Sequence, residues 1–350
     1  MKQKYFNFSL FWDFFKQTKL TGIILAVVLC IITAVPTFAQ YISMGRGNSP
    51  AQISQIAPVL YFAIYFIPIV FTASIFKFLN KRRDSDFFHS LPPTRLCMFF
   101  SGCLASLLWS LITIVAMIFI GYISLLICGL SCPISYIGYL IAYNAVVALI
   151  ITGCASIALS ATGTLIPGLC LTLIIMFLPR LILTIINIMV REQSIIASAL
   201  NDGLFFNQDY NFVTAPLFSA LASGYSNAVS LPAFAGGYIY TGVLGLIYIF
   251  LGALTFRARK SESAEQSAPN RVLQHIYRLL ITLPTLLAAS VLIITTSSQD
   301  SLIIILIVLS IIIYFVYEAI TTKSFKNMLK AAPLFLADIA ICGIVCLTSS

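Results

Sequence analysis

Long apolar runs constrain the fold of this chain more than any other feature of its sequence. A helix needs about 20 apolar residues to cross the hydrocarbon layer of a membrane, because each residue adds about 1.5 Å. Only 9% of the residues are charged, whereas soluble domains carry about 25%. The sequence therefore predicts an all-α, polytopic integral membrane helix bundle with about nine transmembrane helices. Their approximate ranges are residues 20–41, 57–79, 96–127, 137–160, 166–190, 237–256, 276–296, 302–320 and 331–347.

The lysines and arginines predict which ends of these helices face the cytoplasm. Cytoplasmic loops of membrane proteins are enriched in both residue types. With the N-terminus in the cytoplasm, the basic residues of segments 2–19, 77–95, 257–278 and 323–330 all lie on the inner side. Since they lie at the ends of apolar runs and not on one polar face, the formal net charge of +9 reflects topology and predicts no nucleic-acid partner. We expect a multi-pass protein of the plasma membrane with a cytoplasmic N-terminus.

Residues 1–19 carry an amphipathic pattern. Phe8, Phe11, Trp12 and Phe15 repeat at helical spacing on one face, with polar residues opposite. This pattern predicts a helix that lies in the cytoplasmic interface of the membrane. A frayed start of the first transmembrane helix is the alternative.

Two further segments divide the rest of the chain. Residues 191–236 are rich in Phe, Tyr, Ala and Ser, so we expect an outer hairpin region that dips into the membrane and covers whatever lies between the transmembrane helices. Residues 257–275 are polar and predict a cytoplasmic linker. This linker would separate a core of six transmembrane helices, residues 20–256, from C-terminal membrane helices in residues 276–350.

The loop at residues 80–95 is the strongest candidate for a docking site. Asp84 or Ser85 is expected to cap a short helix there. Pro92 and Pro93 should end that helix, because proline lacks the backbone donor and clashes with the preceding turn. The helix would carry an apolar knob with a charged collar, a shape suited to a socket on a soluble partner. The side chains expected to form the knob are Phe87, Phe88 and Leu91.

The sequence lacks the motifs of the common catalytic sites. It contains no phosphate-binding loop of the G-x-x-x-x-G-K-[ST] type, no H-E-x-x-H metal motif and no G-x-S-x-G nucleophile motif. Both histidines, His89 and His275, are expected in the cytoplasm, which excludes a histidine-based site within the membrane. We therefore expect a non-catalytic membrane subunit without a metal or cofactor of its own. Cys128 and Cys132 lie in a short outer loop. They can form a local disulfide or remain two free thiols, and the sequence allows both.

Ionisable residues within the apolar runs are few, and each is costly enough to need a reason. Arg180 is expected to contact an anionic substrate group or to pair with a carboxylate such as Asp338. Glu318 is expected at the inner end of its helix, close to Lys323. Small residues recur at 153–161, which favours close helix packing over a substrate path.

Two motifs indicate a family. The segment D-S-D-F-F-H-S-L-P-P-T-R at 84–95 resembles the D-F-Y-H-S-L-P-x-x-R loop of the Ytr-type permeases, a Gram-positive subgroup of the membrane subunits of type-2 ABC transporters. The segment R-A-R-K-S-E-S-A-E at 257–265 is similar to the basic segment that follows the sixth transmembrane helix in that subgroup. The order of the amphipathic N-terminal helix, six transmembrane helices, coupling loop and outer hairpin agrees with the same family.

The resemblance implies a permease subunit that forms the translocation path and couples to a separate ATPase subunit, which would bind the ATP. It also implies that a second permease copy or a paralogue completes the translocation unit within the lipid bilayer. Larger members of the subgroup continue into an extracytoplasmic domain, so we expect either a short member or a truncated chain. The residues that would contact the ATPase are Asp86, Phe87, Phe88, His89, Ser90, Leu91 and Pro92.

Other functions remain open at this point. A secondary transporter would usually place functional charges or broken helices at the middle of the membrane in two repeated halves, and no convincing repeat is present. A non-transporting membrane sensor is a further alternative. An intramembrane enzyme would need convergent acid, base or metal groups, which the sequence does not offer.

Overall fold

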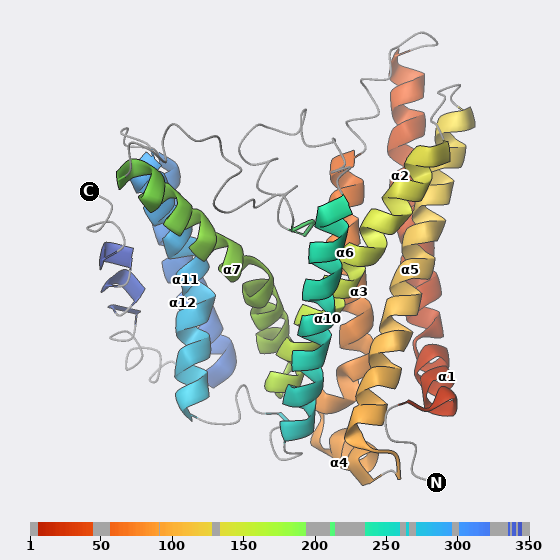
Figure 1. Cartoon of the computed structure of the whole chain (residues 1–350), viewed down its shortest axis with the longest axis horizontal. Coiled ribbons are helices and arrows are strands. Elements are labelled where there is room, and N and C mark those ends of the chain that lie inside the picture. The colour runs from red at the N-terminus through yellow and green to blue at the C-terminus, as the bar shows by residue number, and fades with distance from the viewer. Residues whose placement is uncertain are drawn as a thin grey trace. The chain divides into compact units, whose positions relative to one another are not determined.

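The computed structural model of this chain is mostly helical and has no strand in the residues that it describes. These residues are 6–44, 57–90, 92–127, 134–193, 211–213, 235–259, 264–265, 271–295, 301–322, 335–336, 338–340 and 342–344. The elements are α1 (Phe8–Gln17), α2 (Lys19–Met44), α3 (Ala57–Ile75), the short 3₁₀ helix η2 (Phe76–Asn80), α4 (Arg82–Ser90), α5 (Arg95–Ile127), α6 (Ile134–Ala161), α7 (Leu165–Gln193), α10 (Ala235–Ala258), α11 (Arg271–Thr295) and α12 (Ser301–Thr322), as Figure 1 shows. The predicted all-α fold is confirmed for this part of the chain.

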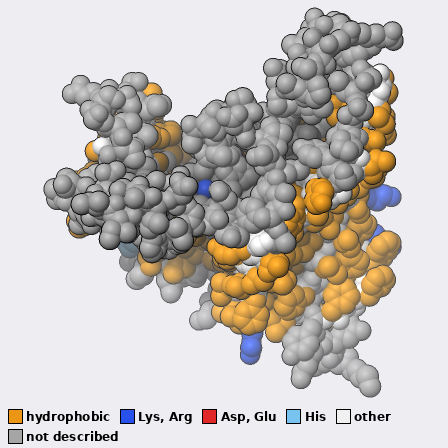
Figure 2. Space-filling view, turned by 45° about the horizontal axis from the view of Figure 1, so that its top comes forward, with side chains coloured by type: hydrophobic (Ala, Val, Ile, Leu, Met, Phe, Trp, Pro, Cys, Tyr) orange, Lys and Arg blue, Asp and Glu red, His pale blue; other side chains and the backbone are white. Residues whose placement is uncertain are grey.

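Several of these helices are suited to a membrane. Among the described residues, three helices are long and apolar enough to cross one: α5, most of α6 and most of α10. The pair α1 and α2, bent by 54° at their junction, adds a fourth if it is counted as one span. Hydrophobic side chains cover much of the described surface in Figure 2, as expected when the solvent is lipid. The structure is thus consistent with a helical membrane protein, while the number of about nine transmembrane helices stays a prediction.

The chain divides into two compact units. Unit 1 comprises Met1–Ser160 and Asp209–Glu262, and unit 2 comprises Ala161–Gln208 and Ser263–Ser350. The last change of unit along the chain, after residue 262, falls inside the predicted linker 257–275. Helix α7 belongs to the same unit as α11 and α12, although the sequence suggested that it belongs to the six-helix core. The division into a permease core and C-terminal membrane helices concerns function and stays a prediction.

Helix α5 is the centre of unit 1, where it packs against α1, α2, α3 and α10. Its Trp109 stacks on Phe15 of α1 at 4.6 Å between ring centroids, and its indole Nε1 donates a hydrogen bond of 3.0 Å to the Phe15 carbonyl. On α2, a Cβ added to Gly22 would lie 2.6 Å from the Trp109 ring, so the two helices approach closely there. A buried aromatic cluster continues this core toward α10, formed by Phe76, Phe78, Phe99 and Phe256.

Helix α1 is a separate helix and not a frayed start of α2. Asn7 caps its N-terminus, because the Asn7 side chain accepts a hydrogen bond from the Ser9 amide. The core of unit 1 receives Phe11 and Phe14, whereas Phe8, which the sequence placed on the same face as Phe11, is 67% exposed. The residues of α1 that pack into unit 1 are thus Phe11 and Phe14, and Phe8 stays on the surface. Its location at the membrane interface stays a prediction.

Helices α6 and α10 are packed closely through glycines, as the small residues at 153–161 predicted. A Cβ added to Gly153 would lie 2.7 Å from Cβ of Tyr248 and 3.2 Å from the Gly245 carbonyl oxygen. A Cβ added to Gly252 would lie 2.5 Å from Oγ of Ser156. Such contacts leave no room for larger side chains, so these glycines set the distance between the two helices.

Unit 2 is built on α11, which packs against both α7 and α12. Its apolar core gathers Leu286 and Leu287 of α11 with Cys342 from the C-terminal segment. Leu178 of α7 packs against the same cluster. Helix α7 remains helical through Pro179.

Candidate functional site

The predicted docking loop contains a short helix, α4, between η2 and α5. It begins at Arg82, so Asp84 and Ser85 lie inside the helix, and the expectation that one of them caps it is wrong. The Ser85 amide donates to the Lys81 carbonyl at 2.9 Å, and Asp84 adds a negative charge to the first turn, where the helix dipole favours it. The helix ends at Ser90, ahead of the two prolines, as predicted.

The two phenylalanines of the predicted knob have different environments. The Phe88 ring lies 4.3 Å from the ring of Phe78 in η2 and 5.9 Å from that of Phe14 in α1, measured between centroids. Phe87 is 61% exposed and meets Phe88 edge-on. Phe88 therefore fastens α4 to unit 1, with help from the fully buried Ser85, and Phe87 is available to a partner.

The other predicted contact residues surround Phe87. Asp86, Ser90 and Pro92 are exposed. The hydroxyl of Ser90 donates to the Phe87 carbonyl at 2.7 Å and thereby closes the last turn of α4. The backbone of His89 belongs to α4, while its side chain and the whole of Leu91 lie outside the described residues.

Arg259 holds the ends of two helical segments together near α4. Its Nη1 donates to the carbonyls of Leu159 at 2.7 Å and Ser160 at 3.1 Å, which lie in the last turn of α6. Its Nη2 donates to the carbonyl of Leu79 in η2 at 2.7 Å. The last carbonyls of a helix have no partner within the helix and carry partial negative charge. A buried guanidinium is therefore a favourable cap for them.

Arg95 does the same for the end of α10. Its Nη1 donates to the carbonyls of Arg259 at 2.6 Å and Arg257 at 3.2 Å. Together, Arg95 and Arg259 join η2, α5, α6 and α10 at the end of unit 1 that carries α4. We call these two residues the arginine clamp. The sequence placed both arginines on the cytoplasmic side and within the two family motifs, but it did not distinguish the buried Arg259 from the exposed Arg257.

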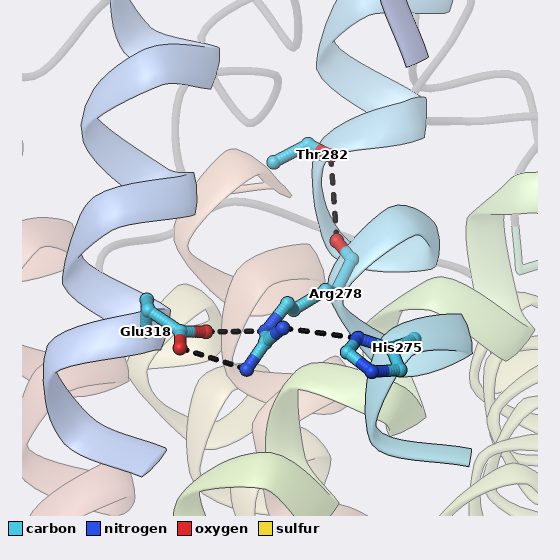
Figure 3. A network of polar contacts seen from close by, with 4 residues as sticks. All are labelled: His275, Arg278, Thr282 and Glu318. Carbon is cyan, nitrogen blue, oxygen red and sulfur yellow. Dashed lines mark hydrogen bonds and ion pairs between the residues drawn. The ribbon is translucent and has the colours of Figure 1, made fainter. Parts of the chain in front are cut away.

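Unit 2 holds a buried ion pair that the sequence did not indicate. The guanidinium of Arg278 on α11 pairs with the carboxylate of Glu318 on α12, and the Nη2–Oε1 distance is 2.7 Å (Figure 3). On its other side, Arg278 lies 3.0 Å from Nδ1 of His275, one turn earlier on α11. Glu318 lies near the C-terminal end of α12, as the sequence suggested, and it is fully buried there. Lys323 lies outside the described residues.

The two intramembrane candidates of the sequence both belong to unit 2. Arg180 is largely buried in α7. Asp338 is fully buried and accepts a hydrogen bond from the hydroxyl of Thr282 on α11. The suggested pair between Arg180 and Asp338 stays a prediction, as does the suggested contact of Arg180 with an anionic substrate.

No cluster of three or more His, Cys, Asp or Glu side chains that could hold a metal ion occurs among the described residues. Cys128 and Cys132, the possible disulfide, lie outside that part of the chain. Comparison of the chain with protein-family models, curated proteins and solved structures found no match in any of the three. Its function must therefore be argued from its own residues.

Proposed function

We propose that this chain is the permease subunit of an ABC transporter, and that it takes its energy from a separate ATPase subunit that docks on α4. The observation that carries the proposal is the arrangement of α4. A short helix between two long apolar helices exposes Phe87, while Phe88 and Ser85 on the same helix are held in the core of unit 1. The motif at 84–95, which resembles the coupling loop of the Ytr-type permeases, provides this helix.

A docking helix transmits a force only if it is fastened to the helices that must move. The Phe88 contacts link α4 to α1 and η2. The arginine clamp then links η2 to α6 and α5 to α10. Closure of an ATPase dimer on Phe87 would thus be passed to α5, α6 and α10 at once. The permease would have two conformations, and nucleotide binding to the ATPase would shift the equilibrium between them.

The proposed topology places α4 and the arginine clamp in the cytoplasm. The basic residues in α4 and just before it are all exposed, as expected for the cytoplasmic side of a membrane protein; they are Lys77, Lys81, Arg82 and Arg83. In this arrangement the N-terminus is cytoplasmic, about nine helices cross the plasma membrane, and six of them form the permease core. A second copy or a paralogue completes the translocation unit. The apolar helices favour a lipid-like, peptide or amphipathic cargo.

Removal of the exposed aromatic ring tests the proposal. The Phe87→Ala variant should bind the ATPase encoded beside the permease about 30-fold more weakly, because an aromatic anchor at the centre of an interface contributes about 2 kcal/mol. Phe8→Ala is a matched control, since Phe8 is similarly exposed but lies on α1. The affinity is measured by co-purification and by titration of the ATPase onto the detergent-solubilised permease. Unchanged affinity of the Phe87→Ala and Phe87→Asp variants would count against α4 as the docking site.

One observation favours a secondary transporter as the second candidate. The buried ionisable residues Arg180 and Asp338 are costly within a membrane, and transporters driven by ion gradients use such residues. Purified protein reconstituted alone in vesicles distinguishes the two functions. Uptake driven by a proton or sodium gradient without any ATPase would favour the secondary transporter.

A further inference from the structure

A short irregular segment is buried deep in unit 1. Phe212 and Val213 are almost completely inaccessible, although Asn211–Val213 forms neither helix nor strand. They come from the predicted outer hairpin region 191–236, of which only residues 191–193, 211–213 and 235–236 are described. Irregular backbone at the depth of a membrane is tolerated only where protein or water satisfies its polar groups.

Side chains of three helices satisfy the backbone of this segment. The hydroxyl of Tyr143 on α6 donates to the Phe212 carbonyl at 2.7 Å, and that of Tyr65 on α3 donates to the Val213 carbonyl at 2.7 Å. The Phe212 amide donates to Oγ1 of Thr241 on α10 at 3.3 Å. Each of the three helices therefore contributes one side chain that recognises the main chain of the segment.

The Phe212 ring completes the contact. It lies 5.1 Å from the ring of Tyr143 on α6 and meets the ring of Tyr238 on α10 edge-on at 4.8 Å, measured between centroids. Below this level, Gly245 brings α10 so close to α6 that a Cβ added to it would lie 3.1 Å from the Ile150 amide nitrogen. The Phe212 side chain thus fills the space between α6 and α10 above their glycine contact.

The segment lies at the end of unit 1 opposite to α4. Helical rise separates Tyr65 from Leu79, Tyr143 from Ser160 and Thr241 from Arg259 by about 20–27 Å. The hydrocarbon layer is about 30 Å thick. With the arginine clamp at the cytoplasmic surface, the segment therefore lies just inside the outer surface of the membrane.

We propose that Phe212 and Val213 form an outer gate, held shut by Tyr65, Tyr143 and Thr241, which must be withdrawn from between α3, α6 and α10 during each transport cycle. This inference rests on the proposed function. The hydrogen bonds from Tyr65, Tyr143 and Thr241 can be broken and re-formed, so the gate has a closed and an open state, and movement of α6 and α10 shifts the equilibrium between them. The arginine clamp joins these same two helices to the α4 end, so ATPase closure and gate opening are coupled through them.

Cysteine labelling tests the gate. Val213→Cys in the complex with its ATPase should react slowly with a membrane-impermeant maleimide added outside, after subtraction of the labelling of the parent chain. Removal of both tyrosine hydroxyls by Tyr65→Phe and Tyr143→Phe should raise the rate at least about tenfold, because the rings remain and only the hydrogen bonds to the segment are lost. Val147→Cys, buried one turn further along α6, is the control and should stay unlabelled. If Val147→Cys also becomes reactive when both tyrosines are replaced, the experiment is repeated with Tyr65→Phe alone.

ATP separates a gate from a static support. Turnover by the coupled ATPase should raise the labelling of Val213→Cys several-fold, and Phe87→Ala should abolish this effect of ATP while leaving the effect of the tyrosine variants intact. Labelling that responds to the tyrosine variants but not to ATP, in a complex that still binds its ATPase, would overturn the gate and leave the proposed function standing. Loss of ATPase binding altogether is detected by co-purification, so failure of the proposed function is distinguishable.

Discussion

Replacement of Arg259 by methionine should lower the stability of unit 1 by about 3–6 kcal/mol. Arg259 donates three hydrogen bonds of 2.7–3.1 Å to main-chain carbonyls, two at the end of α6 and one in η2. A hydrogen bond from a charged donor contributes about 1.5–3 kcal/mol, and a buried acceptor left without a donor costs a similar amount. The three bonds share one guanidinium and are not additive, so the expected total lies below their sum. Methionine keeps most of the apolar contact of the side chain.

The assay is thermal unfolding of the purified protein in detergent. For a unit of this size, 1 kcal/mol corresponds to about 2–4 °C, so the Arg259→Met variant should unfold about 6–24 °C lower. Arg257→Met is the matched control, because Arg257 is exposed two residues earlier and its replacement should change stability by less than about 0.5 kcal/mol. Arg259→Lys should recover only part of the loss, since a compact ammonium lacks the fork that reaches both segments. Equal shifts for Arg257→Met and Arg259→Met would refute the clamp.

Three further predictions concern packing, the buried ion pair and orientation. Gly153→Ala should destabilise unit 1 by about 1–3 kcal/mol, because its Cβ would lie 2.7 Å from a neighbouring Cβ. Gly121→Ala, whose Cβ would have nothing within 4 Å, should be neutral or slightly stabilising. Thermal unfolding compares the two variants, and equal losses of stability would contradict the packing argument. Glu318→Ala should lower the stability of unit 2 by about 3–5 kcal/mol, because it leaves the Arg278 charge buried without its partner. The double variant Glu318→Leu with Arg278→Met should recover most of this stability in the same assay. A double variant no more stable than Glu318→Ala would show that the lost ion pair is not the cause of the destabilisation. Phe87→Cys should react with an impermeant maleimide only after the cells are opened, and reaction in intact cells would reverse the proposed orientation.

The sequence predicted α4 because the relevant signals are local. Two adjacent prolines end a helix in any context, and a run of basic residues between apolar segments has few interpretations in a membrane protein. It could not separate Phe87 from Phe88, because both are apolar neighbours on a short helix. Which of them is buried depends on the positions of Phe14 and Phe78, and Phe14 is far from α4 along the chain.

The same limit explains why the sequence did not indicate the ion pair of unit 2. Glu318 and Arg278 each lie near the end of an apolar run, and neither position alone points to a partner. Their burial follows only from the packing of α11 against α12, which brings the opposite charges together. Arg259 and Arg257 likewise have the same local sequence environment. The carbonyls that distinguish them belong to α6 and η2.

The sequence by itself determined that the chain is helical and apolar enough for a membrane, because hydrogen bonding within each segment and the scarcity of charge are local properties. It also determined where the helix between the second and third apolar runs ends. Only the tertiary structure decided that Phe88 is an anchor, that Arg259 binds two helical segments, and that Phe212 lies between α6 and α10. These facts depend on contacts between side chains that are far apart along the chain. Such contacts are set by the packing of whole helices, which cannot be predicted from a short stretch of sequence.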